Sequence, residues 1–105
     1  MERQFEYRFE WDPAKALRNA RAHGVSFERA TTVFLDPRAL SVFDAKHSED
    51  EERWVTLGLD RTGVLLVVCH TYRADRDSGR EAGARVRLIS ARRADRREST
   101  QYGET

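Results

Sequence analysis

The last quarter of the sequence is rich in arginine, the side chain best suited to binding phosphate. Six arginines and two acidic residues between Arg85 and Glu98 give this segment a local net charge of +4. The planar guanidinium group grips two phosphate oxygens at once and keeps its charge at physiological pH. Arg92 directly follows Ile89-Ser90 at an expected strand-to-helix corner, so we favour it as a phosphate-binding residue over an ordinary surface arginine. Further candidates of the same kind are Arg53, Arg73 and Arg93.

Glu98 is the candidate carboxylate. At about 100° per residue, a helix over 91–102 places Ala91, Ala94, Glu98 and Tyr102 on one face and Arg92 on the opposite one. The alanine face must dock on the domain, and an unpaired carboxylate there would be costly. We therefore expect Glu98 to be at least half buried and paired with an arginine or a backbone donor. Such a pair either serves a catalytic site or is a structural salt bridge, and both interpretations stay open.

Three polar residues share one face of an expected N-terminal helix. Lys15, Asn19 and His23 recur at a spacing of four residues, which brings them onto the same side. They form either a polar rim that faces a substrate or a solvent face on which His23 only caps the last helical carbonyls.

The remaining groups with chemical potential favour ordinary roles. The stretch 44–52 has five acids and one base, and His47 within it lacks the glycine turn and ligand spacing of a cation site, so we expect a solvated loop and no metal. Cys69, the single cysteine, lies in an apolar run and predicts neither a disulfide nor zinc. His70 is either a core histidine with satisfied hydrogen bonds or the edge of a site, and we favour the core.

Local patterns predict the elements that must position these residues. Alternating aromatic and charged residues over 5–11 predict a strand with one buried face, and Asp12-Pro13 and Gly24 bound a helix over 13–23. Ser26 begins a short second helix through Val33, and Arg73–Ala84 is an expected hairpin tip. The other expected elements are strands over 39–43, 53–60, 64–72 and 85–90 and a terminal helix over 91–102.

This order predicts an α+β fold. Consecutive strands joined by short turns pair antiparallel, and two N-terminal helices and one C-terminal helix cover one sheet face. The other face is expected to stay partly open and lined by arginine.

Composition limits the function classes. A chain of 105 residues fits a single domain over 1–105, and 39% hydrophobic with 35% charged residues predict a thin core under a charged surface. We expect no membrane span and no secretory signal, which makes the cytoplasm the expected compartment.

Several short motifs together resemble the BrnT family. The matching residues, in order, are Phe9-Glu10-Trp11-Asp12, Lys15, Asn19, His23-Gly24-Val25-Ser26-Phe27-Glu28, Glu52-Arg53, Gly58 and Ile89-Ser90-Ala91-Arg92-Arg93-Ala94 with Glu98. The resemblance implies a RelE-like fold and a ribonuclease toxin of a type II toxin–antitoxin system that blocks translation.

Metal-independent RNA cleavage needs a base for the 2′-hydroxyl, a cation for the developing phosphorane and an acid for the leaving oxygen. With the resemblance, Arg92, Glu98, His23 and Arg53 are the expected catalytic residues. The expected substrate-binding residues are Lys15, Asn19, Arg73 and Arg93. No cofactor is expected.

The resemblance also implies a partner. A BrnA-type antitoxin with a ribbon-helix-helix DNA-binding domain would neutralise the toxin in a heterotetramer of two chains each, and operator DNA would be bound only through the antitoxin. The alternative is a non-catalytic module that binds nucleic acid or the antitoxin and acts as a co-repressor.

Two departures from the family pattern concern the site. Ala22 stands where many relatives have lysine before the His-Gly pair, which removes a phosphate-binding cation. The segment Arg73–Ala84 is longer than the hairpin usual in relatives and would reshape the mouth of the site.

Overall fold

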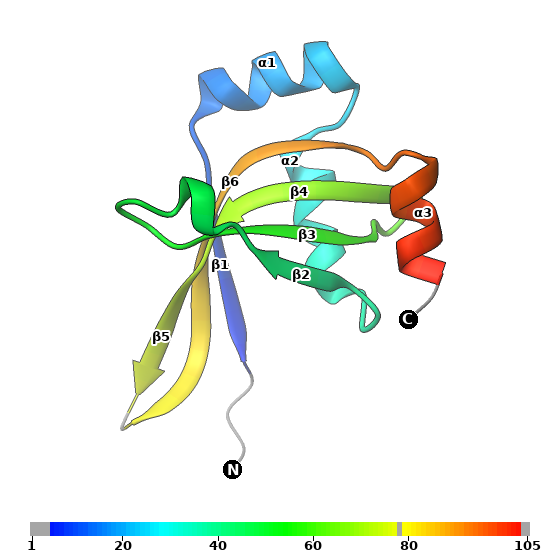
Figure 1. Cartoon of the computed structure of the whole chain (residues 1–105). Coiled ribbons are helices and arrows are strands. Elements are labelled where there is room, and N and C mark those ends of the chain that lie inside the picture. The colour runs from blue at the N-terminus through cyan, green and yellow to red at the C-terminus, as the bar shows by residue number, and fades with distance from the viewer. Residues whose placement is uncertain (1–4, 78, 104–105) are drawn as a thin grey trace.

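The computed structural model describes residues 5–77 and 79–103, and this part of the chain forms a six-stranded sheet with three α-helices. The mixed α+β composition agrees with the sequence prediction (Figure 1). The elements are, in order, β1 (Glu6–Glu10), α1 (Pro13–His23), α2 (Phe27–Thr31), the 3₁₀ turn η1 (Thr32–Leu35), β2 (Leu40–Phe43), the 3₁₀ turn η2 (Ala45–His47), β3 (Arg53–Leu59), β4 (Leu65–Thr71), β5 (Arg73–Asp77), β6 (Arg80–Arg93) and α3 (Arg96–Gly103).

The predicted bounds of α1 and the predicted start of α2 are confirmed by their caps, whereas α2 ends at Thr31 and the 3₁₀ turn η1 replaces the predicted helix through Val33. The side chains of Asp12 and Ser26 accept hydrogen bonds from backbone N–H groups in the first turns of α1 and α2. Gly24 ends α1 in the left-handed conformation, with φ of 68°, which a residue without Cβ adopts at little cost.

Strand β6 connects the two halves of the sheet. The strand order is β1-β6-β4-β3-β2, and β5 pairs with β6 outside this order. The first half of β6 pairs with β1 and β5, and its second half pairs with β4. In Figure 1 the β1, β5 and early β6 segments form an arm that projects from the rest of the sheet.

The pairing of β1 corrects the prediction of an antiparallel sheet. β1 runs parallel to β6, with Glu6 opposite Gly83 and Glu10 opposite Arg87, so the sheet is mixed. Parallel neighbours need a long crossover, and here the whole chain between the two strands supplies it. The backbones of β1 and β6 lie so close together here that a Cβ at Gly83 would clash with the carbonyl oxygen of Glu6.

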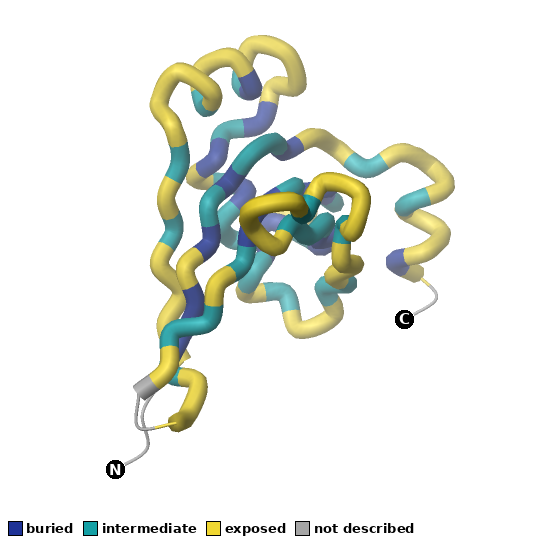
Figure 2. Tube along the Cα trace, turned by 60° about the vertical axis from the view of Figure 1, so that its left-hand side comes forward, coloured by how far each residue is buried: buried dark blue, intermediate teal, exposed yellow. Residues whose placement is uncertain are grey.

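One face of the sheet carries the main core. Segments after α1 and in α2 and η1 pack on strand residues from β4 and β6, and most of these side chains are fully buried. In Figure 2 the buried positions gather at the middle of the sheet, while α1 and the loops are mainly exposed. The core consists of Val25, Phe27, Ala30, Val33, Leu66, Val68, Ala84, Val86, Leu88 and Ala91.

Among the described residues, α3 covers one end of the opposite face, which corrects the expectation that all three helices cover the same face. There Tyr102 of α3 packs with Leu57 and Val67 in a smaller cluster. Elsewhere this face stays accessible, and Val42 is 67% exposed. Because side chains alternate along a strand, the register places Arg53 of β3 and Arg92 of β6 on this same partly covered face.

In the structure the last helix begins later, and the strand before it ends later, than the sequence predicts. β6 continues to Arg93, so Ala91 is a buried strand residue rather than part of a helical docking face. The helix starts after Asp95, whose side chain accepts from the N–H of Glu98 while Glu98 accepts from the N–H of Asp95, both at 2.8 Å. This reciprocal capping box is a local signal for a helix start at Asp95, and the alanine spacing does not contain that signal.

Two further expectations need correction. The segment Arg73–Ala84 does form a hairpin, but as an extension of regular strands β5 and β6. β1 is a strand as predicted, yet its aromatic face is only partly buried, with Phe5 43% and Tyr7 37% exposed. The edge position of β1 leaves this end of its aromatic face without a covering layer.

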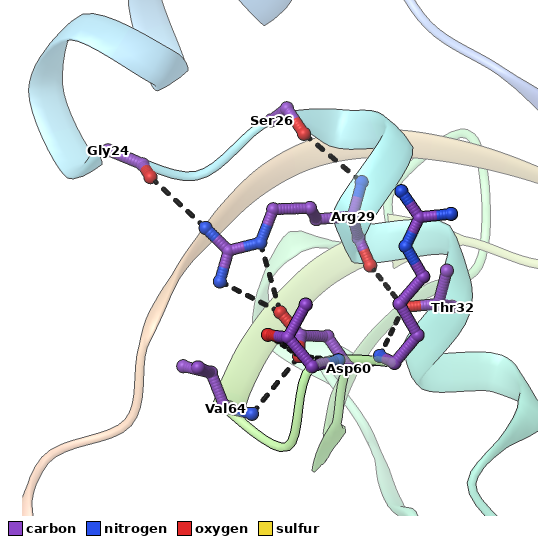
Figure 3. A network of polar contacts seen from close by, with 8 residues as sticks. Gly24, Ser26, Arg29, Thr32, Asp60 and Val64 are labelled. Atoms are coloured by element: carbon purple, nitrogen blue, oxygen red, sulfur yellow. Dashed lines mark hydrogen bonds and ion pairs between the residues drawn. The ribbon is translucent and has the colours of Figure 1, made fainter.

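A buried carboxylate ties the turn after β3 to the helical layer (Figure 3). The side chain of Asp60 is fully buried and accepts from Arg29 Nε at 3.0 Å and Nη2 at 2.8 Å. Its other oxygen accepts from the backbone of Thr62 and Val64, which closes the turn between β3 and β4. Burial alone would raise the pKa of Asp60, but these hydrogen bonds outweigh it and lower the pKa to about 2.

We expect Asp60→Asn to destabilise the protein by about 3 kcal/mol, because it leaves the Arg29 guanidinium without its charged partner. The midpoint of urea unfolding measures the change. Asp75→Asn is a matched control: Asp75 pairs with Arg85 at 3.9 Å and both side chains are more exposed, so its loss should cost less than about 1 kcal/mol.

The pH dependence provides a second readout. Since the pKa of Asp60 is about 2 in the folded protein and 3.8 is the ordinary value, its ionised form stabilises the fold fully above 3.8. The stability gap between wild type and Asp60→Asn should therefore narrow as the pH falls from 3.8 toward about 2. Equal costs for Asp60→Asn and Asp75→Asn would contradict this account.

Candidate functional site

Arg92 and Glu98 form a two-pronged ion pair where β6 leads into α3. Arg92 Nη1 donates to Glu98 Oε1 and Nη2 donates to Oε2, each at 2.8 Å. The Arg92 side chain is 44% exposed and that of Glu98 20% exposed. The prediction that Glu98 is more than half buried and paired with an arginine is confirmed, although the helix geometry behind it was wrong.

The capping box of α3 fixes the position of Glu98. Its Oε1 accepts from both Arg92 and the N–H of Asp95, so one carboxylate closes the helix start and holds the guanidinium. The hydrogen bonds from Arg92 lower the pKa of Glu98 to about 2, and those to Glu98 raise the pKa of Arg92. Both groups therefore stay charged at neutral pH, which excludes Glu98 as a proton donor there.

The ion pair leaves part of the Arg92 guanidinium available. Its five N–H donors have a fixed planar arrangement, and Glu98 and the carbonyl of Arg93 engage one proton of Nη2 and two of Nη1. Within the described residues, the Nε proton and the second Nη2 proton have no protein acceptor. They lie on one edge of the plane, the edge that binds two phosphate oxygens side by side.

A surface pocket of about 220 Å³ lies at the end of the sheet where Arg53 begins β3, and neither Arg92 nor Glu98 lines it. Ser90, two residues before Arg92 on β6, is opposite Cys69 of β4, and Cys69 is opposite Val55 of β3. The pocket is lined by Asp44, His47, Arg53, Trp54, Cys69, His70, Ile89 and Ser90. Two of the arginines expected from the sequence thus share one sheet face but lie toward different ends of it: Arg53 lines this pocket, and Arg92 pairs with Glu98 of α3.

Asn19 has a different environment from the one expected. It is buried, and its amide nitrogen donates to the carbonyls of Val25 at 3.0 Å and Ala91 at 2.8 Å. Its amide oxygen accepts from the N–H of Ala91 at 3.0 Å. The side chain thus bonds the backbone edge of β6 as a neighbouring strand would, and it presents nothing to a substrate.

The remaining expected site residues do not join Arg92 and Arg53. Lys15 and His23 are exposed on α1, so they form no shared rim with the buried Asn19. Arg93 is exposed, and strand alternation directs it away from the face that carries Arg92. Arg73 lies on β5 beside a separate surface pocket of about 520 Å³ that also contains acidic residues.

His70 is a core histidine, as favoured from the sequence. It is 2% exposed, and burial lowers its pKa. Its Nδ1 donates to the carbonyl of Thr71 at 2.8 Å, so Nε2 accepts from the hydroxyl of Thr56 at 2.6 Å.

Two polar groups of this region were missed in the sequence. Asp95 falls inside the predicted helix over 91–102, although Asp95-Arg96-Arg97-Glu98 has the spacing of a capping box. His47 was considered only as a metal ligand, although Asp44 precedes it by three residues and its Nδ1 lies 2.8 Å from Asp44 Oδ2. No cluster of three or more potential metal-binding side chains occurs within residues 5–77 and 79–103.

The described residues thus form a mixed α+β fold that carries Arg53 and Arg92 on one partly open sheet face. The chain belongs to the BrnT family: the family model described as "Ribonuclease toxin, BrnT, of type II toxin-antitoxin system" matches residues 11–98. This confirms the resemblance found in the sequence, and the type II system implies a protein antitoxin as partner. A comparison with curated proteins gives no match. Within the described part of the chain, no helix is long and apolar enough to cross a membrane.

We expect Asn19→Ala to lower the stability by about 2 kcal/mol or more, because it leaves buried backbone groups of Ala91 and Val25 unsatisfied. Chemical denaturation measures the loss. Arg18→Ala, an exposed neighbour on the same helix, should change stability by no more than about 0.5 kcal/mol. A wild-type midpoint for Asn19→Ala would show that these hydrogen bonds do not hold the strand edge.

Proposed function

We propose that the chain is a metal-independent endoribonuclease whose partly open sheet face binds the RNA backbone through Arg92 and Arg53. One observation carries the proposal: Glu98 holds Arg92 by both Nη atoms and leaves the edge formed by Nε and Nη2 available for a phosphate. A guanidinium held in this way needs little reorganisation when negative charge develops on the phosphate, which is the condition for strong electrostatic stabilisation.

The reaction assigns distinct parts to this pair. The 2′-hydroxyl oxygen attacks the adjacent phosphorus, and extra negative charge develops on the non-bridging oxygens before the 5′-oxygen leaves. Arg92 neutralises that charge, and Glu98 is a positioning residue because it remains a carboxylate at neutral pH. Arg53 adds a second cation on the same face.

The other expected residues are proposed to act further from the reacting phosphate. Lys15, His23, Arg73 and Arg93 are exposed and would contact other parts of a longer RNA strand. Asn19 acts indirectly, since it fixes Ala91, the residue before Arg92. In this scheme Ala22 and the long β5–β6 hairpin alter RNA contacts without removing the central pair.

The finer assignments follow from this chemistry and from the family. We propose that RNA cleavage inhibits translation in the cytoplasm, within a single domain of RelE-like fold. The proposed antitoxin is of the BrnA type, and operator DNA would be bound through its ribbon-helix-helix domain.

The cleavage test uses purified toxin and total RNA in excess EDTA. We expect wild-type protein to cleave and Arg92→Gln to lose about a hundredfold or more in rate, the scale of one lost preorganised charge donor. Arg92→Lys keeps the charge but loses the fork, so it should not restore the rate. Glu98→Gln should stay folded and lose activity because the guanidinium is no longer held.

Arg80→Gln is the matched control, because Arg80 is an exposed arginine at the far end of the same strand. Binding of RNA by the wild type without any cleavage would favour the non-catalytic co-repressor module instead. Cleavage that stops in EDTA and returns with a divalent ion would overturn metal independence.

The proposed complex is also testable. We expect a heterotetramer of two toxins and two antitoxins, and binding that weakens as salt rises because the antitoxin covers the cationic face. Sedimentation and titration at increasing ionic strength measure both properties. A simple one-to-one complex, or affinity independent of salt, would contradict this assembly.

A further inference from the structure

Three arginines from distant parts of the sequence lie side by side across the arm formed by β1, β5 and the first half of β6 (Figure 1). The parallel register pairs Arg8 of β1 with Arg85 of β6, and the antiparallel register pairs the same Arg85 with Arg73 of β5. Paired residues of neighbouring strands project from the same face of a sheet, so these three side chains form one row, called here the arginine row. At about 4.8 Å between strands, the row is about 10 Å wide.

The arginine row is exposed and only partly neutralised. Arg8, Arg73 and Arg85 are all exposed, and Arg85 Nε lies 3.9 Å from Asp75 Oδ1. Within residues 5–77 and 79–103, Arg8 and Arg73 make no ion pair. Like charges directly opposite each other on neighbouring strands destabilise a sheet, so the needs of folding do not explain this row.

The other residues of the arm favour a polyanion over a protein as the ligand of this face. Alternation along β1 places Glu6 and Glu10 on the same face as Arg8. The aromatic Tyr7 and Phe9 lie on the opposite face, where Phe9 packs against the core. The centre of a protein–protein interface is depleted in charged residues, whereas aligned guanidinium groups suit the repeated phosphates of a nucleic acid. Glu6 and Glu10 flank the row and repel phosphates, so the favoured path of a backbone crosses the strands along the row.

The register also places the arginine row relative to the proposed phosphate-binding residues. Arg92 is opposite Val67 of β4, toward the α3 end of the sheet. Arg53 is opposite Thr71 at the other end of β4, and β5, which begins with Arg73, follows there. Measured along the strands at about 3.3 Å per residue, the row is roughly 20 Å from Arg92, with Arg53 at an intermediate position. Only an RNA strand of several nucleotides spans that distance.

We propose that Arg8, Arg73 and Arg85 form a second subsite for the RNA backbone, separate from the proposed site at Arg92. This inference rests on the proposed function and adds a substrate class to it: RNA strands long enough to reach the arm, with the backbone crossing β1, β6 and β5. The β5–β6 hairpin builds the subsite, because it supplies two of the three arginines. The subsite contributes affinity for RNA and takes no part in the bond-breaking step.

The experiment measures binding separately from cleavage. Its probe is a fluorescent, fully 2′-O-methylated RNA oligonucleotide, which lacks the 2′-hydroxyl that attacks the phosphorus. We expect the double variant Arg8→Gln/Arg73→Gln to bind it about tenfold or more weakly, because two charge-assisted contacts to phosphate are lost. At about 0.7 per phosphate contact, the slope of log affinity against log salt should become shallower by about 1.4. The ratio of wild-type to variant affinity should rise with oligonucleotide length, since a short strand does not occupy both subsites.

Two single substitutions on the arm are matched controls with different expected results. Arg80→Gln removes an exposed arginine of β6 that lies outside the row, and it should keep the wild-type affinity. Asp75→Asn removes the carboxylate beside Arg85, and it should strengthen RNA binding. Urea unfolding verifies the fold: the double variant should be at least as stable as the wild type, because it removes like charges from facing positions.

The possible results separate the inference from the proposed function. Equal losses of RNA affinity for Arg80→Gln and the double variant would show a general charge effect and overturn the subsite. Unchanged RNA affinity with weaker antitoxin binding would assign the row to the antitoxin and also overturn it. If the double variant binds RNA normally while Arg92→Gln stops cleavage, the inference fails and the proposed function stands. If the wild type cleaves no RNA, the proposed function fails, and the binding measurement still decides on the row.

Discussion

The backbone of β6 must find hydrogen-bond partners along all 14 of its residues, and the arrangement of the other elements follows from this requirement. Along one edge, β6 pairs first with β5 and then with β4. Along the other edge it pairs with β1 as far as Arg87. Beyond that point the side chain of Asn19 bonds both backbone groups of Ala91. This contact brings α1 onto the open edge and fixes the backbone next to Arg92.

Two carboxylates attach the remaining elements to the sheet. Asp60 links the turn after β3 to Arg29 of α2, and its burial makes that link specific, since a buried charge is tolerated only with full hydrogen bonding. Asp36 accepts from the hydroxyl of Tyr102 at 2.6 Å and from the N–H of Leu59 at 2.8 Å, and so connects α3 to β3. Polar contacts outside the thin core therefore hold α2 and α3 against the sheet.

The sequence predicted those features that depend on neighbouring residues. Caps at Asp12, Ser26 and Gly24 act within one helical turn, so the bounds of α1 and the start of α2 were predicted correctly. The parallel pairing of β1 with β6 depends on contacts between residues far apart in the chain, which no local pattern reveals. The same limit applies to Asn19, whose partner Ala91 lies 72 residues away. Alanines fit a strand core and a helix face equally well, so Ala91 was assigned to the wrong element. A partner for Glu98 was anticipated, either an arginine or a backbone donor, but Arg92 was expected on the opposite face because it was assigned to the helix rather than to β6.

The pairing of Arg92 with Glu98 weakens the long-range electrostatic attraction of the guanidinium group but fixes its orientation. A carboxylate bound at 2.8 Å cancels much of the guanidinium field at long range, so in the proposed site Arg92 would attract RNA less strongly than an unpaired arginine. In this proposal Arg53 and the exposed basic residues would supply that attraction. Close to the phosphate the paired arginine has the advantage over an unpaired one, because a side chain already held in place loses little conformational entropy on binding. The advantage is greatest when extra charge develops on the phosphate oxygens, since the Nε and Nη2 protons already point along one edge. In the proposed reaction the ion pair would therefore favour the transition state over the ground state, which is the requirement for catalysis rather than for tight binding.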